Sequence, residues 1–183
     1  MKRMPNLEFH EVAAARWGDF ERLFESRGGP KNCWCMVWRA GAKTTKGPDR
    51  KAAIRQYVCN DMPSGCSAIP KVSPLHGARS PRGQHTVTLA VRTTLENVLN
   101  KWSLVCFFIR RELRGQGLTK QVIEAAVQHA EKRGATVVEA YPVDPGSPSY
   151  RFMGYVQTFI AAGFREVGRA GTRRHVMRRE LCR

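Results

Sequence analysis

The stretch of this sequence best suited to chemistry is a short loop that contains two glycines. Residues 114–117 (RGQG) follow an apolar and aromatic run at 102–109 and precede an amphipathic segment. Glycine has no Cβ, so the backbone N–H groups of such a loop can approach a ligand closely. At the start of a helix, free N–H groups and the helix dipole also favour negative charge. The loop is therefore suited to bind a pyrophosphate or a similar anion.

The segments on both sides of the loop must hold it in place. The run at 102–109 (WSLVCFFI) is apolar enough to form a strand that is buried on both faces. Apolar residues within 119–133 recur on one face of a helix, and Gly134 predicts its end. A β-branched strand follows at 136–141 and stops at Pro142. Because a helix connects the two strands, we expect them to be parallel.

Two common phosphate-binding motifs do not fit this stretch. The Rossmann fingerprint needs three glycines at another spacing and an acidic residue further on, and the P-loop needs Gly-Lys-Ser/Thr. Residues 114–119 (RGQGLT) instead resemble the acetyl-CoA site of the GNAT N-acetyltransferase superfamily, whose signature is Arg/Gln-x-x-Gly-x-Gly/Ala. Thr119 stands where the family has a small residue, and we expect it to cap the helix or to offer a hydroxyl to phosphate. An apolar helix at 152–162 followed by Gly-Phe at 163–164 is also a GNAT ending.

The resemblance implies a single α/β GNAT-like domain over residues 1–183. Its central sheet is expected to be mixed and mostly antiparallel, with flanking helices and a parallel splay between the strands at 102–109 and 136–141. The sequence predicts the other elements: an opening strand at 7–12, helices at 13–27 and 48–58, and closing strands at 165–168 and 175–181. The aromatic and sulfur-rich run at 33–38 fits either core packing or the wall of an acceptor pocket.

The resemblance also implies acetyl-CoA as the acetyl donor. Backbone groups of the first splayed strand would pair with the pantetheine amides and polarise the thioester carbonyl. Backbone N–H groups of the loop and the helix start would hold the pyrophosphate, and Arg110 and Arg111 would add charge near it. The cofactor-binding residues implied in this way are Cys106, Phe107, Phe108, Ile109, Arg114, Gly115, Gln116, Gly117, Thr119 and Lys120.

The catalytic residues are harder to assign. Many GNAT enzymes place a Tyr acid four residues before the glycine of Gly-Phe, and Phe159 occupies that position here. Tyr155, one turn earlier, and Tyr141, at the end of the neighbouring strand, are the candidate replacements. Glu139 is a candidate base, because burial in an apolar strand would raise its pKa. The alternative for Glu139 is a half-buried acid that pairs with an arginine, and for each tyrosine it is ordinary core packing.

These observations predict an N-acetyltransferase that moves an acetyl group to an amine by direct attack in a ternary complex. A CoA-binding or regulatory domain that has lost catalysis is the first alternative, because the usual acid is missing. The acceptor is a small-molecule or peptide amine of open identity. Trp34, Trp38 and Phe152 suggest an apolar wall around it, whereas the basic composition suggests an acidic acceptor.

Residues 64–101 do not follow the GNAT pattern. They contain several glycines and prolines and show no strand alternation before 85–92. The resemblance implies a hairpin of two strands within residues 64–101. A shift of two nucleotides from Gly65 allows residues 65–82 to be read as LLGYSEGVPAAWCSVAPR, which has two strand-like halves around a Glu-Gly turn. We therefore consider a compensated frameshift whose frame returns near Lys101. The alternative is an ordinary basic insertion.

Composition limits the remaining possibilities. The net charge of +16 comes from 31 basic and 15 acidic residues and favours polyanionic partners. A basic nucleic-acid-binding protein is thus a second alternative. No nucleic-acid-binding motif accompanies the charge, so we do not expect a nucleic-acid partner. No signal peptide or membrane-spanning run is visible, which predicts a cytoplasmic protein. The six cysteines are expected to be thiols, with no metal site. The oligomeric state is open, and a homodimer is one possibility.

Overall fold

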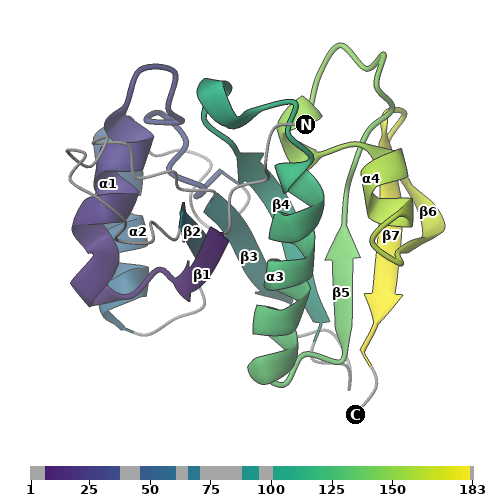
Figure 1. Cartoon of the computed structure of the whole chain (residues 1–183), viewed down its shortest axis with the longest axis horizontal. Coiled ribbons are helices and arrows are strands. Elements are labelled where there is room, and N and C mark those ends of the chain that lie inside the picture. The colour runs from purple at the N-terminus through teal and green to yellow at the C-terminus, as the bar shows by residue number, and fades with distance from the viewer. Residues whose placement is uncertain (1–6, 38–45, 61–65, 71–87, 95–100, 182–183) are drawn as a thin grey trace, which may run out of the picture.

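The computed structural model describes residues 7–37, 46–60, 66–70, 88–94 and 101–181, and the other residues are drawn in grey in Figure 1. The described elements are, in chain order, β1 (Leu7–Glu11), η1 (Ala14–Arg16), α1 (Trp17–Glu25), α2 (Gly47–Cys59), β2 (Cys66–Pro70), β3 (Thr88–Thr94), β4 (Lys101–Phe108), η3 (Arg111–Leu113), α3 (Leu118–Lys132), β5 (Val137–Ala140), η4 (Arg151–Met153), α4 (Val156–Ile160), β6 (Arg165–Ala170) and β7 (Arg174–Glu180).

The main sheet is mixed and mostly antiparallel, as the sequence predicts. Its strand order is β3-β4-β5-β7-β6, and β1 and β2 form a separate antiparallel pair. The pair β4–β5 is parallel, because α3 connects these strands and carries the chain back to the same end of the sheet. The pairs β3–β4, β5–β7 and β6–β7 are antiparallel.

The two parallel strands separate part of the way along β4. Their register starts at Lys101 opposite Val137 and ends at Leu104 opposite Ala140. Beyond this point β4 continues to Phe108, and its other edge stays paired with β3. The expected splay is therefore confirmed, and in the described part of the chain the β5-facing edge of residues 105–108 has no strand partner.

Two hydrophobic clusters hold the sheet. The first lies between the sheet and the two helices α3 and α4, which cover the same face in Figure 1. The second gathers α1, α2 and the segment 33–37 around Val105 and Cys106 of β4. Helix α1 joins it because Trp17, Phe20 and Phe24 recur at helical spacing and are buried. None of the helices in the described ranges is both long and apolar enough to cross a membrane.

The structure corrects two expectations. The predicted helix at 152–162 is divided into η4 and α4, because Gly154 between them adopts φ +85°. A Cβ at Gly154 would lie 2.9 Å from the Phe159 ring, so glycine is required there for close packing as well. Within 64–101, residues 66–70 form β2, although the sequence showed no strand before 85. The rest of the proposed frameshifted segment, at 71–87 and 95–100, lies outside the described residues.

Candidate functional site

The loop between β4 and α3 is held in shape by one buried side chain and by a hydrogen bond from an arginine side chain to the backbone. The short helix η3 places Leu113 in the interior, and Arg114 Nε donates a hydrogen bond to the Ile109 carbonyl at 2.9 Å. Gly115 and Gly117 adopt φ +73° and +71°, which residues with a Cβ rarely adopt. A Cβ at either position would meet no atom within 4 Å. These glycines are therefore required by backbone conformation, and the space above them is open.

Helix α3 begins directly after this loop. Gly117 is its N-cap residue, and Leu118, the first helical residue, is buried and anchors the helix start. The N–H groups of the first turn have no carbonyl partner within a helix and carry the positive end of its dipole. Thr119 is the second helical residue, so the expectation that it caps the helix is wrong. Thr119 is half-exposed and lies two positions after Gly117 of the open loop.

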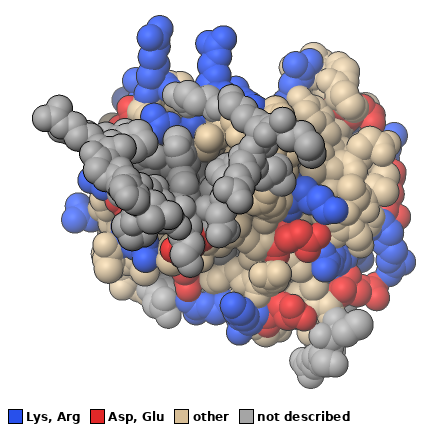
Figure 2. Space-filling model, viewed as in Figure 1, with Lys and Arg blue, Asp and Glu red and all other residues tan. Residues whose placement is uncertain are grey.

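Positive charge surrounds the loop. Arg111, Arg114 and Lys120 are exposed, and no carboxylate among the described side chains forms an ion pair with them. Figure 2 shows Lys and Arg side chains that project from the upper edge of the molecule, where Figure 1 places the loop between β4 and α3. Arginines that have no carboxylate partner among the described side chains are available to an anionic ligand. The loop therefore combines backbone donors, a helix start and cationic side chains.

The predicted cofactor-binding part of β4 lies at the splay. Cys106 and Phe107 are buried, and Phe108 and Ile109 are half-buried. Phe107 belongs to the cluster with α3 and α4, whereas Cys106 belongs to the cluster with α1 and α2. The side chains are thus taken up by the two cores. The backbone edge is the part that an extended ligand can reach, as a strand would.

Glu139 lies at the start of the splay, on β5. It is 3% exposed and accepts hydrogen bonds from Arg178 Nε at 2.6 Å and from the Tyr141 hydroxyl, with Lys101 Nζ at 3.7 Å. Burial raises its pKa, but the hydrogen bonds from Tyr141 and Arg178 and the charge of Lys101 outweigh burial, so the net pKa is lowered. The expectation of a raised pKa is therefore wrong. The alternative from the sequence, an acid paired with an arginine, is what the structure contains.

The three aromatic candidates differ in accessibility. The Tyr141 hydroxyl donates to the Glu139 carboxylate. Phe159 is fully buried, with ring centroids 5.8 Å from Phe107 and 5.1 Å from Phe164, so the usual acid position is an apolar pocket here. Tyr155 is 37% exposed at the start of α4, next to Gly154, whose Cβ position is 3.7 Å from the Phe107 ring. Among these residues, Tyr155 is the exposed one, and it directly follows the glycine that packs against Phe107 of β4.

The cysteines of the segment 33–37 form a feature that sequence reasoning missed. The Cys35 thiol donates a hydrogen bond that lowers the pKa of Cys106 against the effect of burial, and burial raises the pKa of Cys33. Trp34 and Cys35 adopt φ 45° and 57°, and Trp34 stacks on Phe24 at 5.1 Å. The run 33–37 is therefore core packing, whereas Trp38 lies outside the described residues. No group of three or more His, Cys, Asp or Glu side chains in the described ranges is placed to hold a metal ion.

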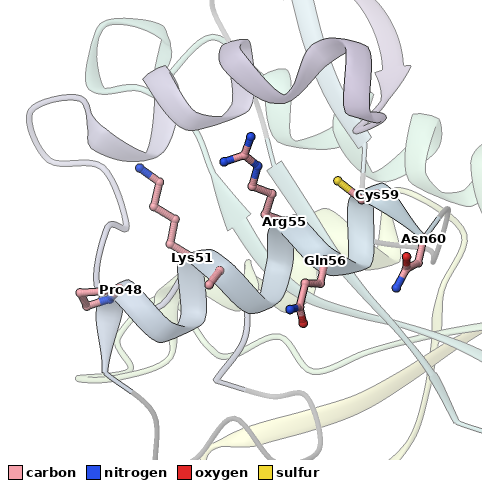
Figure 3. Close-up of a pocket in the computed structure, with 7 residues that line it drawn as sticks. Pro48, Lys51, Arg55, Gln56, Cys59 and Asn60 are labelled. Atoms are coloured by element: carbon pink, nitrogen blue, oxygen red, sulfur yellow. The ribbon is translucent and has the colours of Figure 1, made fainter.

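A surface pocket of about 520 Å³ lies away from the splay, along α2. Its lining residues are Pro48, Lys51, Ala52, Arg55, Gln56, Cys59 and Asn60, most of them labelled in Figure 3. Figure 3 shows Lys51 and Arg55 pointing toward α1. There Lys51 pairs with Glu21 and Glu25 at 2.6 Å, and Arg55 lies over the Trp17 ring at 5.8 Å. These cations connect the two helices, so the pocket is not the candidate site.

Comparisons with known proteins agree with this geometry. Residues 87–155 match the model of the acetyltransferase (GNAT) family. A GNAT-family acetyltransferase from Listeria monocytogenes is 12% identical, with a TM-score of 0.58 over 96% of this chain and 95% of that chain. An acetyltransferase from Thermus thermophilus is 16% identical, with a TM-score of 0.56 over 97% of this chain and 99% of that chain.

A third structure with the same fold contains ligands. It is the N-acetylglutamate synthase from Neisseria gonorrhoeae, complexed with coenzyme A and N-acetyl-glutamate. It is 10% identical, with a TM-score of 0.57 over 99% of this chain and 36% of that chain. No curated protein matches the sequence significantly. The family match over β3 to η4 and the shared fold agree with the resemblance: this part of the chain matches the GNAT acetyltransferase family model, and the chain has the fold of solved GNAT acetyltransferases.

Proposed function

We propose that this protein transfers an acetyl group from acetyl-CoA to an amine by direct attack in a ternary complex. The observation that carries the proposal is the end of β4–β5 pairing at Leu104, while β4 continues beside a glycine loop and a helix start. This arrangement offers an unpaired strand edge next to an anion-binding loop. A ligand with a pyrophosphate and an amide-containing arm matches both features.

The residues present fit the cofactor. The open space above Gly115 and Gly117 admits a phosphate to the backbone, and the exposed Arg114 and Lys120 supply charge. Acetyl-CoA supplies an activated thioester when bound. The residues assigned to hold it are those expected from the sequence: Cys106, Phe107, Phe108 and Ile109 through their backbone, and Arg114, Gly115, Gln116, Gly117, Thr119 and Lys120 through backbone, hydroxyl or charge.

The chain's own groups then divide the catalytic work. Backbone N–H groups of β4 orient the thioester carbonyl and stabilise charge on its oxygen. Tyr155 donates a proton to the departing thiolate, because it is exposed and directly follows Gly154, which packs against Phe107 of β4. Glu139 and Tyr141 bond each other, and the lowered pKa makes Glu139 a weak base. We therefore assign these two residues to positioning the end of β5, and the amine enters in its neutral form.

Titration calorimetry with acetyl-CoA at moderate salt tests the cofactor assignment. Wild type should bind with a micromolar dissociation constant, equivalent to about −8 kcal/mol. Gly117→Glu should abolish binding, because it places an anion where the pyrophosphate approaches. Gly28→Glu is the matched control, since Gly28 adopts φ +79° and also has nothing within 4 Å of its Cβ position. Equal losses in the two variants would remove the loop from the proposal.

The domain that has lost catalysis is retained as a second candidate, because Phe159 fills the usual acid position with an apolar ring. Release of CoA during incubation with a panel of amines distinguishes the two candidates. Binding of acetyl-CoA without turnover of any amine would favour the second. A folded chain that fails to bind acetyl-CoA but binds DNA with a steep salt dependence would instead favour the nucleic-acid alternative.

We also propose that residues 1–183 form one domain whose segment 64–101 contains a compensated frameshift. The support is the sequence pattern alone, and β2, which the residues as written form at 66–70, counts against it. The encoding DNA decides the point. Codons that cannot yield the alternative string in any frame would leave the segment as an ordinary insertion.

A further inference from the structure

Arginines and aromatic rings gather where the loop after β5 meets the β6–β7 hairpin. We call this group the Arg/aromatic surface, and its members are Tyr150, Arg151, Phe152, Tyr155, Arg173 and Arg174. Phe152 and Tyr155 are 42% and 37% exposed, and Arg151 and Arg173 are also exposed. The chemistry assigned above does not use the arginines, so their concentration at one place needs its own explanation.

Each arginine is held by a contact with the loop 147–150. Arg151 Nε donates to the Ser147 carbonyl at 2.7 Å, and Arg173 Nη1 donates to Ser149 Oγ at 3.1 Å. Arg174 lies over the Tyr150 ring, with its guanidinium carbon 5.1 Å from the ring centroid. The guanidinium groups therefore approach the same short loop from two different elements, η4 and the hairpin.

The described partners of Arg151 and Arg173 leave the charge of these two side chains available. Arg151 and Arg173 bond neutral oxygens, and among the described side chains no carboxylate forms an ion pair with either. The neighbouring acids are engaged elsewhere: His175 has Asp144 at 3.2 Å from Nε2 and Glu166 at 3.0 Å from Nδ1. Each guanidinium carries five N–H donors and can hold a carboxylate through two of them.

The loop 147–150 has a fixed conformation in the absence of a ligand. Tyr150 adopts φ 62°, an uncommon conformation for a residue with a side chain. The Ser147 hydroxyl donates to the Ser149 carbonyl at 2.9 Å, and the Tyr150 and Phe152 rings meet edge to face at 6.2 Å. Strain and internal bonding at an exposed loop indicate a constraint beyond packing.

The surface borders the proposed reaction site. Helix η4 packs against β4, and Gly154, between η4 and Tyr155, meets the Phe107 ring at its Cβ position. Because β4 and β5 are parallel, the loop after β5 lies at the same edge of the sheet as the β4–α3 loop (Figure 1), which forms the proposed phosphate site with arginines of its own. The Arg/aromatic surface is a second basic surface at this edge, built from η4 and the β6–β7 hairpin rather than from the β4–α3 loop.

Resting on the proposed function, we propose that the Arg/aromatic surface selects the acceptor, which is an amine that carries a carboxylate next to an aromatic side chain. Arg151 and Arg173 bind the carboxylate, and the exposed rings of Phe152 and Tyr155 contact the aromatic group. This occupant accounts for both the exposed Phe152 ring and the basic charge of the neighbouring arginines.

A pair of product analogues tests the proposal without turnover. The probes are N-acetyl-L-phenylalanine and N-acetyl-L-phenylalaninamide, which differ in the charge of one group, and their binding is measured by calorimetry with and without CoA. We expect the acid to bind at least tenfold more tightly than the amide. Arg173→Gln should weaken acid binding about tenfold and leave amide binding unchanged. Arg173 has an exposed guanidinium and one hydroxyl partner, so this variant is expected to fold.

Arg165→Gln on β6 is the matched control, because it removes the same charge from an exposed pair with Glu180 and should leave acid binding unchanged. Equal binding of acid and amide, or no binding of either, overturns the proposal. So does an Arg173→Gln variant that weakens acetyl-CoA instead of the acid, since the arginine would then serve the cofactor phosphates. Acetyl-CoA titration of the same preparation tests the proposed function separately, because the analogues are also measured without CoA.

Discussion

The two ends of the candidate site are built from different parts of the chain. At the β4–α3 loop, the ligand-binding features are backbone N–H groups, two glycines in the left-handed conformation and a helix start. At the loop after β5, the features are side chains: the arginines, the aromatic rings and the Glu139 network. The backbone groups of the first site come from a short run of consecutive residues, whereas the side chains of the second come from elements that are distant in the sequence and meet only in the fold.

This difference predicts which end depends on single distant side chains. Replacing Arg178 with Met leaves the Glu139 carboxylate buried without its closest cationic partner. We expect a loss of about 3 kcal/mol in the free energy of unfolding, at the low end for a broken buried pair because Arg178 is 40% exposed. Urea unfolding of wild type and the variant measures this loss of stability. Arg165→Met, which breaks the exposed pair with Glu180, should cost less than about 1 kcal/mol. Similar losses in the two variants would contradict the buried network.

The next effect concerns catalysis at the side-chain end. Tyr155→Phe removes the proposed proton donor and should lower kcat about 100-fold with little change in KM or stability, because the ring is exposed. Tyr141→Phe is the comparison, since its hydroxyl bonds Glu139. That variant should mainly lower stability, by about 1 kcal/mol. A larger fall in kcat for Tyr141→Phe than for Tyr155→Phe would exchange the roles of the two tyrosines.

The same contrast explains how much could be predicted from the sequence. The apolar run before the loop, the glycine pair and Gly134 are local signals, so they predicted the strand, loop, helix and parallel splay. The division of 152–162 into η4 and α4 depends on the approach of the Phe159 ring to Gly154, which no local pattern contains. The lowered pKa of Glu139 depends on Arg178, from a strand 39 positions further along the chain. Burial could be anticipated from the apolar strand, but the ion pair that reverses its effect could not.

A strain variant isolates the backbone end. Gly115→Ala adds one methyl group in open space, so its cost comes from φ +73° rather than from a clash. We expect about 1 kcal/mol of lost stability and a clear loss of acetyl-CoA affinity by calorimetry. Gly28→Ala, at φ +79°, should lose similar stability but keep its affinity. An unchanged affinity in Gly115→Ala would show that the loop conformation is not needed for binding.

The smallest effect is the pH dependence of stability that Glu139 contributes. Its pKa in the folded protein lies below the ordinary value of 4.5, because the bonds from Tyr141 and Arg178 and the charge of Lys101 outweigh burial. The unfolded chain therefore takes up the proton first as the pH falls. The contribution to stability is present above pH 4.5 and is lost as the pH falls through the folded pKa. Burial opposes the bonds, which keeps the effect small.

Unfolding free energies of wild type and Glu139→Gln, measured from neutral pH down to below pH 4.5, give this contribution. The variant should lose stability at neutral pH, and the difference between the two proteins should shrink below pH 4.5. The pKa of Glu21 is also lowered, by its hydrogen bond from Lys51, so Glu21→Gln shows how much of the acid dependence arises on α1 rather than at the splay. A difference for Glu139→Gln that grows as the pH falls would mean that Glu139 has a raised pKa. In that case Glu139 would return as a candidate base, and the side-chain end of the site would hold a proton acceptor beside Tyr141.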